Sequence, residues 1–365
     1  MMNDYNSLCD SSKTTHKRSW QTKIAMMLFF VMFSVFQMKG QVSVVGTTAG
    51  TTPVSYATLN AAFTAINAGT HKGAISVTIT ANTTEPATAV PLLKSSGTSS
   101  YTSISIKPSG GNFTINSAAT PTASKGIIIL QGADNVTIDG DDPATSGTQN
   151  LSFVMATNAS TGTACIQLAS NSTTGADGAD NNTVKNCIIT GGRSSATSTT
   201  SSYGIVMCDI SAIATGASSS LNTIIQNNLI TRSYYGVYAN GASASYPNTG
   251  TQILNNTIGS ATSANNIGNK GIYIRVGDYG TTGYGVSIAG IEINTSNYGI
   301  RVLGNNIHDI AQPSTSGYGA YGITISGATN CTLGYIQNNI IRDITASNYT
   351  TSLTSIYTNY GIYFS

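Results

Sequence analysis

One short phrase recurs along the second half of the chain, and it limits the possible folds more than any other feature of the sequence. The phrase is a Tyr or Lys, then Gly, then two apolar residues separated by one variable residue. Its copies are "YGIVM" at 203, "YGVYA" at 235, "KGIYI" at 270, "YGIRV" at 298, "YGITI" at 321 and "YGIYF" at 360. The intervals between the glycines are 32, 35, 28, 23 and 39 residues. This variation indicates equivalent strands with loops of different length between them.

A second phrase, centred on asparagine, alternates with the first. Its copies are "KNCII" at 185, "QNNLI" at 226, "LNNTI" at 254, "GNNIH" at 304 and "QNNII" at 337. Both phrases alternate apolar and polar residues with period 2 and are bounded by turn residues, so both predict short strands. No intervening segment has the periodicity of a crossover helix, which weighs against Rossmann-like and barrel folds. Repeats that bury their apolar face only against neighbouring repeats predict an all-β solenoid, in which stacked asparagines hydrogen-bond from turn to turn.

The alternation within the first phrase assigns its residues to two faces. The two apolar residues of each copy are expected to point inward. They are Ile205/Met207, Val237/Ala239, Ile272/Ile274, Ile300/Val302, Ile323/Ile325 and Ile362/Phe364. The residues between them are expected to form one column on the outer face. They are Val206, Tyr238, Tyr273, Arg301, Thr324 and Tyr363.

Two longer stretches carry a resemblance to known proteins. "YGITISGATNCTLGYIQNNIIRDI" (321–344) resembles a turn of right-handed parallel β-helix proteins. "YATLNAAFTAINAGTHKGAISVTI" (56–79), followed by "GADNVTIDG" (132–140), resembles secreted β-helix repeat proteins of Bacteroidetes-type bacteria. The resemblance covers roughly residues 42–365 and implies a right-handed parallel β-helix. It also implies that the amphipathic segment 56–68 is a helix capping the N-terminal end of the solenoid.

The sequence further predicts how the chain is divided. Residues 1–40 contain a basic leader and the apolar run "IAMMLFFVMFSVF", which together are typical of a secretory signal peptide. An N-terminal membrane anchor is the alternative, although the run is shorter than the ~20 residues of a span. Residues 41–124 are expected to form the cap and the first irregular turns, and 125–365 the regular turns. The resembled proteins lead us to expect a C-terminal sorting domain, so the end at "YGIYFS" is interpreted as a truncation of the reading frame.

Removal of the leader changes the charge of the chain. Five of the 16 basic residues and two of the 14 acidic residues lie in 1–40, which leaves 11 against 12 and a net charge of −1. This balance gives no indication of nucleic-acid binding. We expect a secreted or cell-surface protein with no membrane span after removal of the signal.

Acidic clusters are the first candidates for chemistry. Glycoside hydrolysis needs two carboxyl groups about 5–10 Å apart, and Asp139, Asp141 and Asp142 form the densest group. A turn closing a strand, or a bound cation, are the alternatives for this cluster. Asp177 and Asp180 lie in the loop "GADGADNNT", where their oxygens are ligands suited to Ca²⁺, against the alternative of a solvated turn. A calcium ion is the only cofactor that the sequence suggests.

Other chemistry-bearing residues give weaker signals. Lyase chemistry needs a basic residue, for which Arg275, Arg301 and Arg342 are candidates by type alone. Four cysteines follow the leader, Cys165, Cys187, Cys208 and Cys331. The first three are 22 and 21 residues apart, so stacking on consecutive turns as buried thiols is expected, with a disulfide as the alternative.

The pair His308–Asp309 raises the question of an acid–base device. Aligned by turn, "GNNIHDI" places His308 at the position of Arg342 and Asp309 at that of Asp343, with Thr190 and Thr231 near the same corner in earlier turns. A position that accepts His, Arg or Thr is typical of an outward structural residue. A functional pair remains the alternative.

Tyrosine gives the strongest functional indication. Tyr precedes Gly in five of the six copies of the first phrase, and the outer column adds Tyr238, Tyr273 and Tyr363 beside Arg301 and Thr324. Aromatic rings on a rigid face can stack on sugar rings, so a polysaccharide or cell-surface glycan is the expected partner. Stacking of tyrosine on tyrosine to stabilise the turns is the alternative.

We therefore expect an adhesin-like or glycan-binding scaffold without an identifiable enzymatic site. A β-helix polysaccharide lyase or hydrolase and a purely structural stalk are the other two hypotheses. An enzyme should bring three or more Asp, Glu, His or Arg side chains together in one groove. A glycan-binding protein should show an aromatic and amide strip.

Overall fold

The computed structural model places most of the chain after the leader. It describes residues 23, 40–157, 162–172, 176–196, 198, 200–211, 213, 219–241, 248–276, 288–294, 299–313, 320–326, 334–347 and 360–364. The chain divides into two compact units, Met1–Gly40 and Gln41–Ser365. The expected signal peptide lies almost wholly outside the described residues. No helix of the described part is long and apolar enough to cross a membrane.

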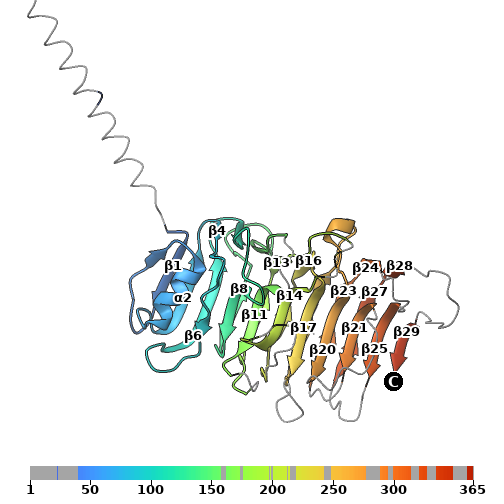
Figure 1. The fold of residues 1–365 in the computed structure, drawn as a ribbon. Helices are drawn as coiled ribbons and strands as arrows, with labels where there is room; N and C mark the ends of the chain where they lie inside the picture. The colour runs from blue at the N-terminus through green and yellow to red at the C-terminus, as the bar shows by residue number, and fades with distance from the viewer. Residues whose placement is uncertain are drawn as a thin grey trace, which may run out of the picture. The chain divides into compact units, whose positions relative to one another are not determined.

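The second unit consists mainly of parallel strands arranged in three long sheets (Figure 1). The ten-strand sheet has the order β2 (Val54–Tyr56), β1 (Val42–Gly46), β3 (Gly73–Ile79), β6 (Tyr101–Pro108), β9 (Val136–Asp139), β12 (Thr183–Lys185), β15 (Ile224–Gln226), β18 (Gln252–Leu254), β22 (Arg301–Leu303) and β26 (Tyr335–Gln337). The eight-strand sheet has the order β4 (Thr83–Thr84), β7 (Phe113–Asn116), β10 (Leu151–Val154), β13 (Cys187–Thr190), β16 (Leu229–Thr231), β19 (Thr257–Ile258), β23 (Asn306–Ile307) and β27 (Ile340–Ile341).

The nine-strand sheet has the order β5 (Leu92–Leu93), β8 (Gly126–Gln131), β11 (Thr163–Ser170), β14 (Ser202–Asp209), β17 (Tyr235–Gly241), β20 (Lys270–Val276), β21 (Ile288–Asn294), β25 (Ala320–Ser326) and β29 (Tyr360–Phe364). A small fourth sheet pairs β24 (Ile310–Pro313) with β28 (Ile344–Ser347), and Ser263–Asn265 form the short helix η1. Only β1 pairs with its neighbours β2 and β3 in antiparallel fashion among the described strands.

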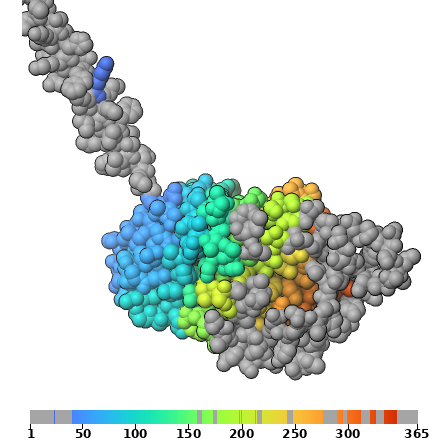
Figure 2. Space-filling model, viewed as in Figure 1, coloured from blue at the N-terminus to red at the C-terminus, as the bar shows by residue number. Residues whose placement is uncertain are grey.

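The order of the strands shows how the chain is routed. From β3 to β20, successive strands belong in turn to the ten-, eight- and nine-strand sheets, and from β6 on each pairs with the strand three places earlier. The described turns follow one another from the blue N-terminal end to the orange turns (Figure 2). This routing is compatible with the predicted β-helix-like solenoid, and the predicted all-β class is confirmed.

The inward positions of the strands form a continuous apolar core. Ile205, Met207, Val237, Ile272 and Ile274 have no exposed surface, as the alternation predicts. They belong to one cluster of buried residues that extends from Val42 in β1 to Ile310 in β24. The side chains of Ile362 and Phe364 lie outside the described residues. Each turn therefore buries its apolar face against the turns before and after it.

Asparagine side chains connect successive turns of the chain. The N–H and the Nδ2 of Asn228 both donate to Oδ1 of Asn256, at 3.0 and 2.9 Å. The same two bonds join Asn256 to Asn305 at 2.9 and 3.0 Å, and Asn305 to Asn339 at 2.9 Å each. The Nδ2 of Asn256 also donates to the Ile225 carbonyl oxygen of the preceding turn. The predicted asparagine stacking is confirmed, and we call this column the asparagine ladder.

The residue before each ladder asparagine makes the corner itself. Asn227, Asn255 and Asn338 have φ between +53° and +55°, and Gly304 has φ +67° at the equivalent place. Asparagine and glycine are the residues that adopt this left-handed conformation most readily. The two residues of the Asn-Asn doublet therefore have different roles. The first adopts the left-handed conformation of the corner, and the side chain of the second hydrogen-bonds to the equivalent residue of the next turn.

The predicted helix forms as α2 (Leu59–Asn67) and packs against β1, β2 and β5 at the N-terminal end (Figure 1). Its apolar face, with Leu59, Phe63 and Ile66, is completely buried. The buried carboxylate of Glu85 accepts the backbone N–H groups of Leu59 at 3.1 Å and Asn60 at 2.9 Å. The carboxylate accepts hydrogen bonds from N–H groups that have no acceptor within the helix. Its negative charge also interacts favourably with the positive N-terminal end of the helix dipole.

The regular routing is interrupted once. β20 and β21 are consecutive in the sequence and adjacent in the nine-strand sheet, with no described strand of the other two sheets between them. β25 then pairs with β21, whereas β22 pairs with β18 and β23 with β19. We call this pair of adjacent strands the β20–β21 step. Because of it, the nine-strand sheet contains one strand more than the regular routing would give it.

The three described cysteines after the leader are free and buried, which confirms the buried-thiol interpretation for them. Their stacking on consecutive turns is wrong. Ala164 and Ala169 pair with Tyr203 and Cys208, so Cys165 is not opposite Cys208, and Cys187 lies in the eight-strand sheet beside Leu151. A spacing of 22 or 21 residues is shorter than one turn here, because the register partners Ala169 and Cys208 are 39 residues apart. Cys331 lies outside the described residues.

The asparagine ladder makes a testable prediction about stability. Asn256→Ala leaves the buried N–H and one of the two Nδ2 hydrogens of Asn228 without an acceptor, while Nδ2 keeps its bond to the Val184 carbonyl oxygen. We therefore expect a loss of about 1–3 kcal/mol in the free energy of unfolding. Asn255→Gly is the matched control, because φ +53° suits glycine and Gly304 already occupies this place in the next turn. Urea unfolding followed by circular dichroism measures both variants. Equal shifts of the two midpoints would contradict a specific role for the ladder.

Candidate functional site

The outer face of the nine-strand sheet carries most of the predicted site residues. The strand register aligns one outward residue from each strand in a single column. From β14 to β29 this column is Val206, Tyr238, Tyr273, Glu292, Thr324 and Tyr363. The predicted placement of Tyr238, Tyr273 and Thr324 is correct, and so is the backbone position of Tyr363. The side chain of Tyr363 lies outside the described residues.

The placement of Arg301 in this column is wrong. Arg301 lies in β22 of the ten-strand sheet, between Gln252 and Tyr335, where it is exposed and stacks 5.6 Å from the ring centre of Tyr335. Its phrase "YGIRV" leads directly into an asparagine doublet, and strands in that position belong to the ten-strand sheet. Glu292, in the sequence "AGIEI", takes the place in the column. That copy keeps Gly-Ile-x-Ile but has alanine instead of tyrosine, so the search for Tyr-Gly missed it.

The tyrosines of this face pack against one another. The rings of Tyr203 and Tyr235 stack with centroids 5.2 Å apart, and Tyr238 contacts Tyr203 at 5.3 Å and Tyr273 at 5.2 Å. Tyr234 meets Tyr235 edge-on at 4.9 Å. We call these five residues the tyrosine cluster. Offset and edge-on contacts of this kind stabilise the neighbouring turns by about 0.5–1.5 kcal/mol per pair beyond the area they bury.

Burial corrects the expectation of an open aromatic strip. Tyr203 is 2% exposed, Tyr238 is 3% exposed and Thr324 is 7% exposed, whereas Tyr235 and Tyr273 are half-buried. Burial raises the pKa values of Tyr203 and Tyr238 well above their ordinary range, while the nearby charge of Arg275 acts in the opposite direction. The hydroxyl groups of Tyr203 and Tyr238 are therefore neutral hydrogen-bonding groups at any physiological pH.

A buried ion pair adjoins the cluster at the β20–β21 step. Nζ of Lys270 lies 3.1 Å from Oε2 of Glu292, and the two side chains are only 7% and 9% exposed. The ammonium group also lies 4.5 Å from the ring centre of Tyr273 and 5.9 Å from that of Tyr235. Asn294 completes the network, because its Nδ2 donates to Oε1 of Glu292 at 3.0 Å and to the Tyr273 hydroxyl at 3.3 Å.

Lys270, Glu292 and Asn294 were not predicted as site residues. A lysine in place of the usual tyrosine in "KGIYI" and a glutamate in place of a neutral residue in "AGIEI" are the signals in the sequence. In a chain with only 8% charged residues, two charges in adjacent equivalent phrases are unusual. The Oγ1 atom of Thr324, the next residue in the column after Glu292, is buried and has no hydrogen-bond partner within the part of the chain that is described.

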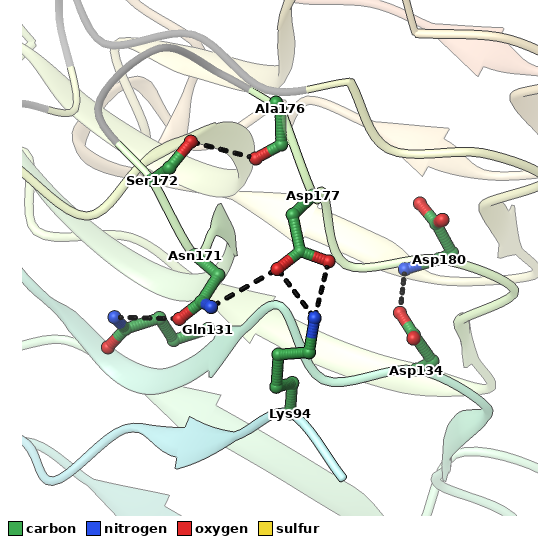
Figure 3. A network of polar contacts seen from close by, with 8 residues as sticks. All are labelled: Lys94, Gln131, Asp134, Asn171, Ser172, Ala176, Asp177 and Asp180. Carbon is green, nitrogen blue, oxygen red and sulfur yellow. Dashed lines mark hydrogen bonds and ion pairs between the residues drawn. The ribbon is translucent and has the colours of Figure 1, made fainter. Parts of the chain in front are cut away.

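The predicted calcium loop contains a different arrangement. Asp177 accepts two bonds from Nζ of Lys94, at 2.9 and 2.7 Å, and one from Nδ2 of Asn171 at 3.1 Å (Figure 3). Asp180 points elsewhere, and its Oδ1 accepts the N–H of Leu221 at 2.8 Å. Asp134, which was not predicted, accepts the N–H of Asp180 at 2.7 Å. The carboxylates of this loop thus tie backbone and lysine groups of neighbouring turns together.

The second acidic cluster also binds protein groups. Asp139 lies between two lysines of adjacent strands, Lys107 at 3.2 Å and Lys185 at 3.3 Å, and accepts Nδ2 of Asn186 at 2.8 Å. Asp142 accepts the N–H of Gly110 at 2.7 Å. The turn interpretation therefore accounts for these two residues. The backbone N–H of Asp141 donates to Oδ1 of Asp139 at 3.2 Å.

No group of three or more His, Cys, Asp or Glu side chains within the described ranges is arranged to hold a metal ion. Calcium binding by Asp177 and Asp180, or by Asp139, Asp141 and Asp142, stays a prediction. The lyase candidates are equally dispersed. Arg275 lies in the nine-strand sheet and Arg301 in the ten-strand sheet, and Arg342 follows β27 and pairs with Asp343 at 2.6 Å.

His308 and Asp309 form a local pair at a corner. Nδ1 of His308 lies 2.6 Å from Oδ2 of Asp309, and Asp309 has φ +51°. Asp343 has φ +55° at the equivalent corner, and the residue pairs Ile307–Ile341 and Thr190–Thr231 align the column as predicted. The aspartate therefore makes the turn while its neighbour, His308 or Arg342, binds its carboxylate. This geometry favours the structural interpretation.

The two acidic loops predict opposite responses to pH. Burial raises the pKa of Asp180 from 3.8 to about 6, and the negative charges of Asp134 and Asp177 act in the same direction. A carboxyl group with a raised pKa stabilises the folded state at low pH and costs stability as the pH rises from about 4 to about 6. We expect Asp180→Asn to be more stable than the wild type at pH 7.5 and equal to it at pH 3.5. Denaturant midpoints at the two pH values test this, and a less stable variant at pH 7.5 would contradict it.

Asp139 should behave in the reverse manner. Burial alone would raise the pKa of Asp139, but the hydrogen bonds from Asn186 and the Asp141 amide, together with Lys107 and Lys185, hold it below its usual value. The ionised Asp139 stabilises the folded state fully above the ordinary aspartate pKa. This stabilisation is lost as the pH falls through the lowered pKa of Asp139 in the folded protein. We expect Asp139→Asn to lose about 1–3 kcal/mol at pH 7.5, with the difference shrinking in acid. The same titration of denaturant midpoints gives the measurement, and a loss independent of pH would contradict the electrostatic origin.

Comparisons with known proteins give no relative for this chain: no protein-family model, no curated protein and no solved structure matches it. The function must therefore be inferred from the residues of the outer face themselves.

Proposed function

We propose that the protein is a secreted or cell-surface, right-handed parallel β-helix that acts as an adhesin-like scaffold and binds polysaccharide on the outer face of its nine-strand sheet. The resemblance of residues 42–365 to secreted repeat proteins of Bacteroidetes-type bacteria supports the scaffold and its export. The apolar run in residues 1–40 supports a signal peptide. In this proposal residues 41–124 form the N-terminal cap and the first irregular turns, and residues 125–365 form the turns of the β-helix.

The observation that carries the binding proposal is the composition of one rigid face. The half-buried rings of Tyr235 and Tyr273 lie beside Lys270, Glu292 and Asn294, all on adjacent strands. Aromatic faces can stack on the C–H faces of sugar rings, while amide and charged groups bond to sugar hydroxyls. Because the strands are fixed by the core and the ladder beneath them, these groups are held in position before a ligand arrives.

The same face disfavours the enzymatic hypothesis. Among its described residues, the carboxylate of Glu292 is occupied by Lys270 and Asn294, and Arg275 is the only other Asp, Glu, His or Arg on β17, β20 and β21. The half-buried rings of Tyr235 and Tyr273 and the amide of Asn294 are the part of this face that matches the aromatic and amide strip expected of a binding protein. The stalk hypothesis differs from the proposal only in predicting no ligand, so a binding experiment separates the two.

Affinity electrophoresis through gels containing soluble polysaccharides tests the proposal. We expect at least one polysaccharide to retard the wild type, and Tyr273→Ala to abolish the retardation, because this ring is the half-buried member next to the polar groups. Tyr335→Ala is the matched control, since Tyr335 is a 46% exposed tyrosine of the ten-strand sheet. Unchanged circular dichroism verifies the fold of both variants. Equal retardation of Tyr273→Ala and wild type would refute the proposed face, and no retardation by any polysaccharide would favour a stalk.

A further inference from the structure

Arg193 is a buried cation that contacts only neutral groups. It lies three residues after β13 and is 1% exposed. Its Nε donates to the Ser198 carbonyl oxygen at 3.2 Å, and its Nη1 donates to the carbonyl oxygen of Asn266 at 3.4 Å and to Oδ1 of the same residue. Its Nη2 donates to the carbonyl oxygens of Ala196 and, at 3.3 Å, Ala311. Within the described residues, no carboxylate binds this guanidinium.

The place of this charge is costly, and its bonds show what it does there. Burial removes the hydration of the guanidinium and no anion replaces it, so the placement opposes folding. The same burial lowers the pKa of Arg193 from 12.5 to about 10, while the neighbouring Tyr234 acts in the opposite direction. The planar fork joins three segments that are distant in the sequence: the one after β13, the one before β20, and β24. A lysine ammonium could not join all three, because it is a compact charge with three donors.

The backbone of Gly268 lies against both Arg193 and Tyr234. A Cβ atom added to Gly268 would lie 2.7 Å from Nε of Arg193 and 2.7 Å from Cδ2 of Tyr234. The guanidinium and the tyrosine ring therefore pack against the same backbone, with no room for a side chain. Where Arg193 holds this backbone also decides where the ring of Tyr234 lies.

Asn269 connects Tyr234 to the start of β20. Its backbone N–H donates to the Tyr234 carbonyl oxygen at 2.8 Å, and its Nδ2 donates to the Tyr234 hydroxyl at 3.2 Å. Tyr234 meets the ring of Tyr235 edge-on at 4.9 Å, and Lys270 directly follows Asn269. Two groups of the outer face, the Tyr235 ring and the Lys270 ammonium, are therefore continuous with the segment that Arg193 binds.

We propose that Arg193 is the positioning residue of the polysaccharide-binding face. It contacts no ligand, and it sets the positions of Tyr235 and Lys270 by fixing the backbone from Asn266 to Asn269. The binding measurement below rests on the proposed function, whereas the position of the rings can be measured without a ligand.

Near-ultraviolet circular dichroism tests the positioning of the rings directly. Tyrosine dominates this spectrum, because the chain has 19 tyrosines and one tryptophan, Trp20, which lies in the leader. We expect Arg193→Lys to lose a large part of the tyrosine ellipticity while its far-ultraviolet spectrum stays that of the wild type. A wild-type tyrosine spectrum in this variant would overturn the proposal.

Affinity electrophoresis of the same variant measures the consequence for binding. We expect the dissociation constant for the retarding polysaccharide to rise about tenfold, because the ligand must then order Tyr235 and Lys270 itself. Tyr234→Phe removes the hydroxyl that accepts the Asn269 amide, and it should weaken binding in the same direction even if Arg193→Lys fails to fold. Unchanged affinity in either folded variant would overturn the proposal. If no polysaccharide retards the wild type, the proposed function fails and the tyrosine spectrum alone decides the role of Arg193.

Arg232→Lys is the matched control. Arg232 also binds neutral oxygens, since its Nε donates to the Gly191 carbonyl at 2.7 Å and its Nη2 to the Met155 carbonyl at 2.6 Å, and burial lowers its pKa as well. Its side chain reaches the preceding turns, away from Gly268. We expect this variant to lose stability but to keep the tyrosine spectrum and the affinity of the wild type. Equal changes in both lysine variants would indicate a general loosening of the corner and would overturn the specific role of Arg193.

Discussion

The rest of the structure depends on the hydrogen bonds between asparagine amides of successive turns. A chain of short stacked strands must turn sharply between one sheet and the next, and each such corner leaves backbone amides without strand partners. The column from Asn228 to Asn339, which is buried as far as Asn305, supplies those partners from the next turn. With the corners superimposed, the strands on either side fall into register, and the isoleucines of the core stack as a consequence.

The stacking of the corners and of the apolar core was largely predictable, because short local sequence patterns indicate both. The doublet Asn-Asn signals both a left-handed residue and a stacked amide, and the Ile-x-Ile pattern signals the buried face. Leu59, Phe63 and Ile66 likewise identified the helix at the N-terminal end. Such features depend on residues close together in the sequence, so a single chain suffices to find them.

The candidate site was less predictable because it depends on which strands become neighbours. Arg301 was assigned to the tyrosine column since its phrase has the right letters, but the β20–β21 step places Glu292 there instead. The burial of Tyr238 could not be predicted from the alternation either, because alternation separates two faces and does not show whether the outer one is covered. Lys270 and Glu292 form an ion pair only because the β20–β21 step places their strands side by side, with Glu292 three residues beyond the register partner of Lys270.

The asparagine ladder also has a direction. Each described rung donates its N–H and Nδ2 to the oxygen of the rung that follows in the sequence, while the following side chain returns one bond to a carbonyl behind it. A newly formed turn is therefore incomplete until its successor arrives, whereas it completes the turn before it at once. A chain that leaves a narrow exit N-terminus first, whether a ribosome or a secretion channel, would present its turns in the order in which each one satisfies the last. For such a fold, the chain emerges in the same direction in which its turns become fully hydrogen-bonded.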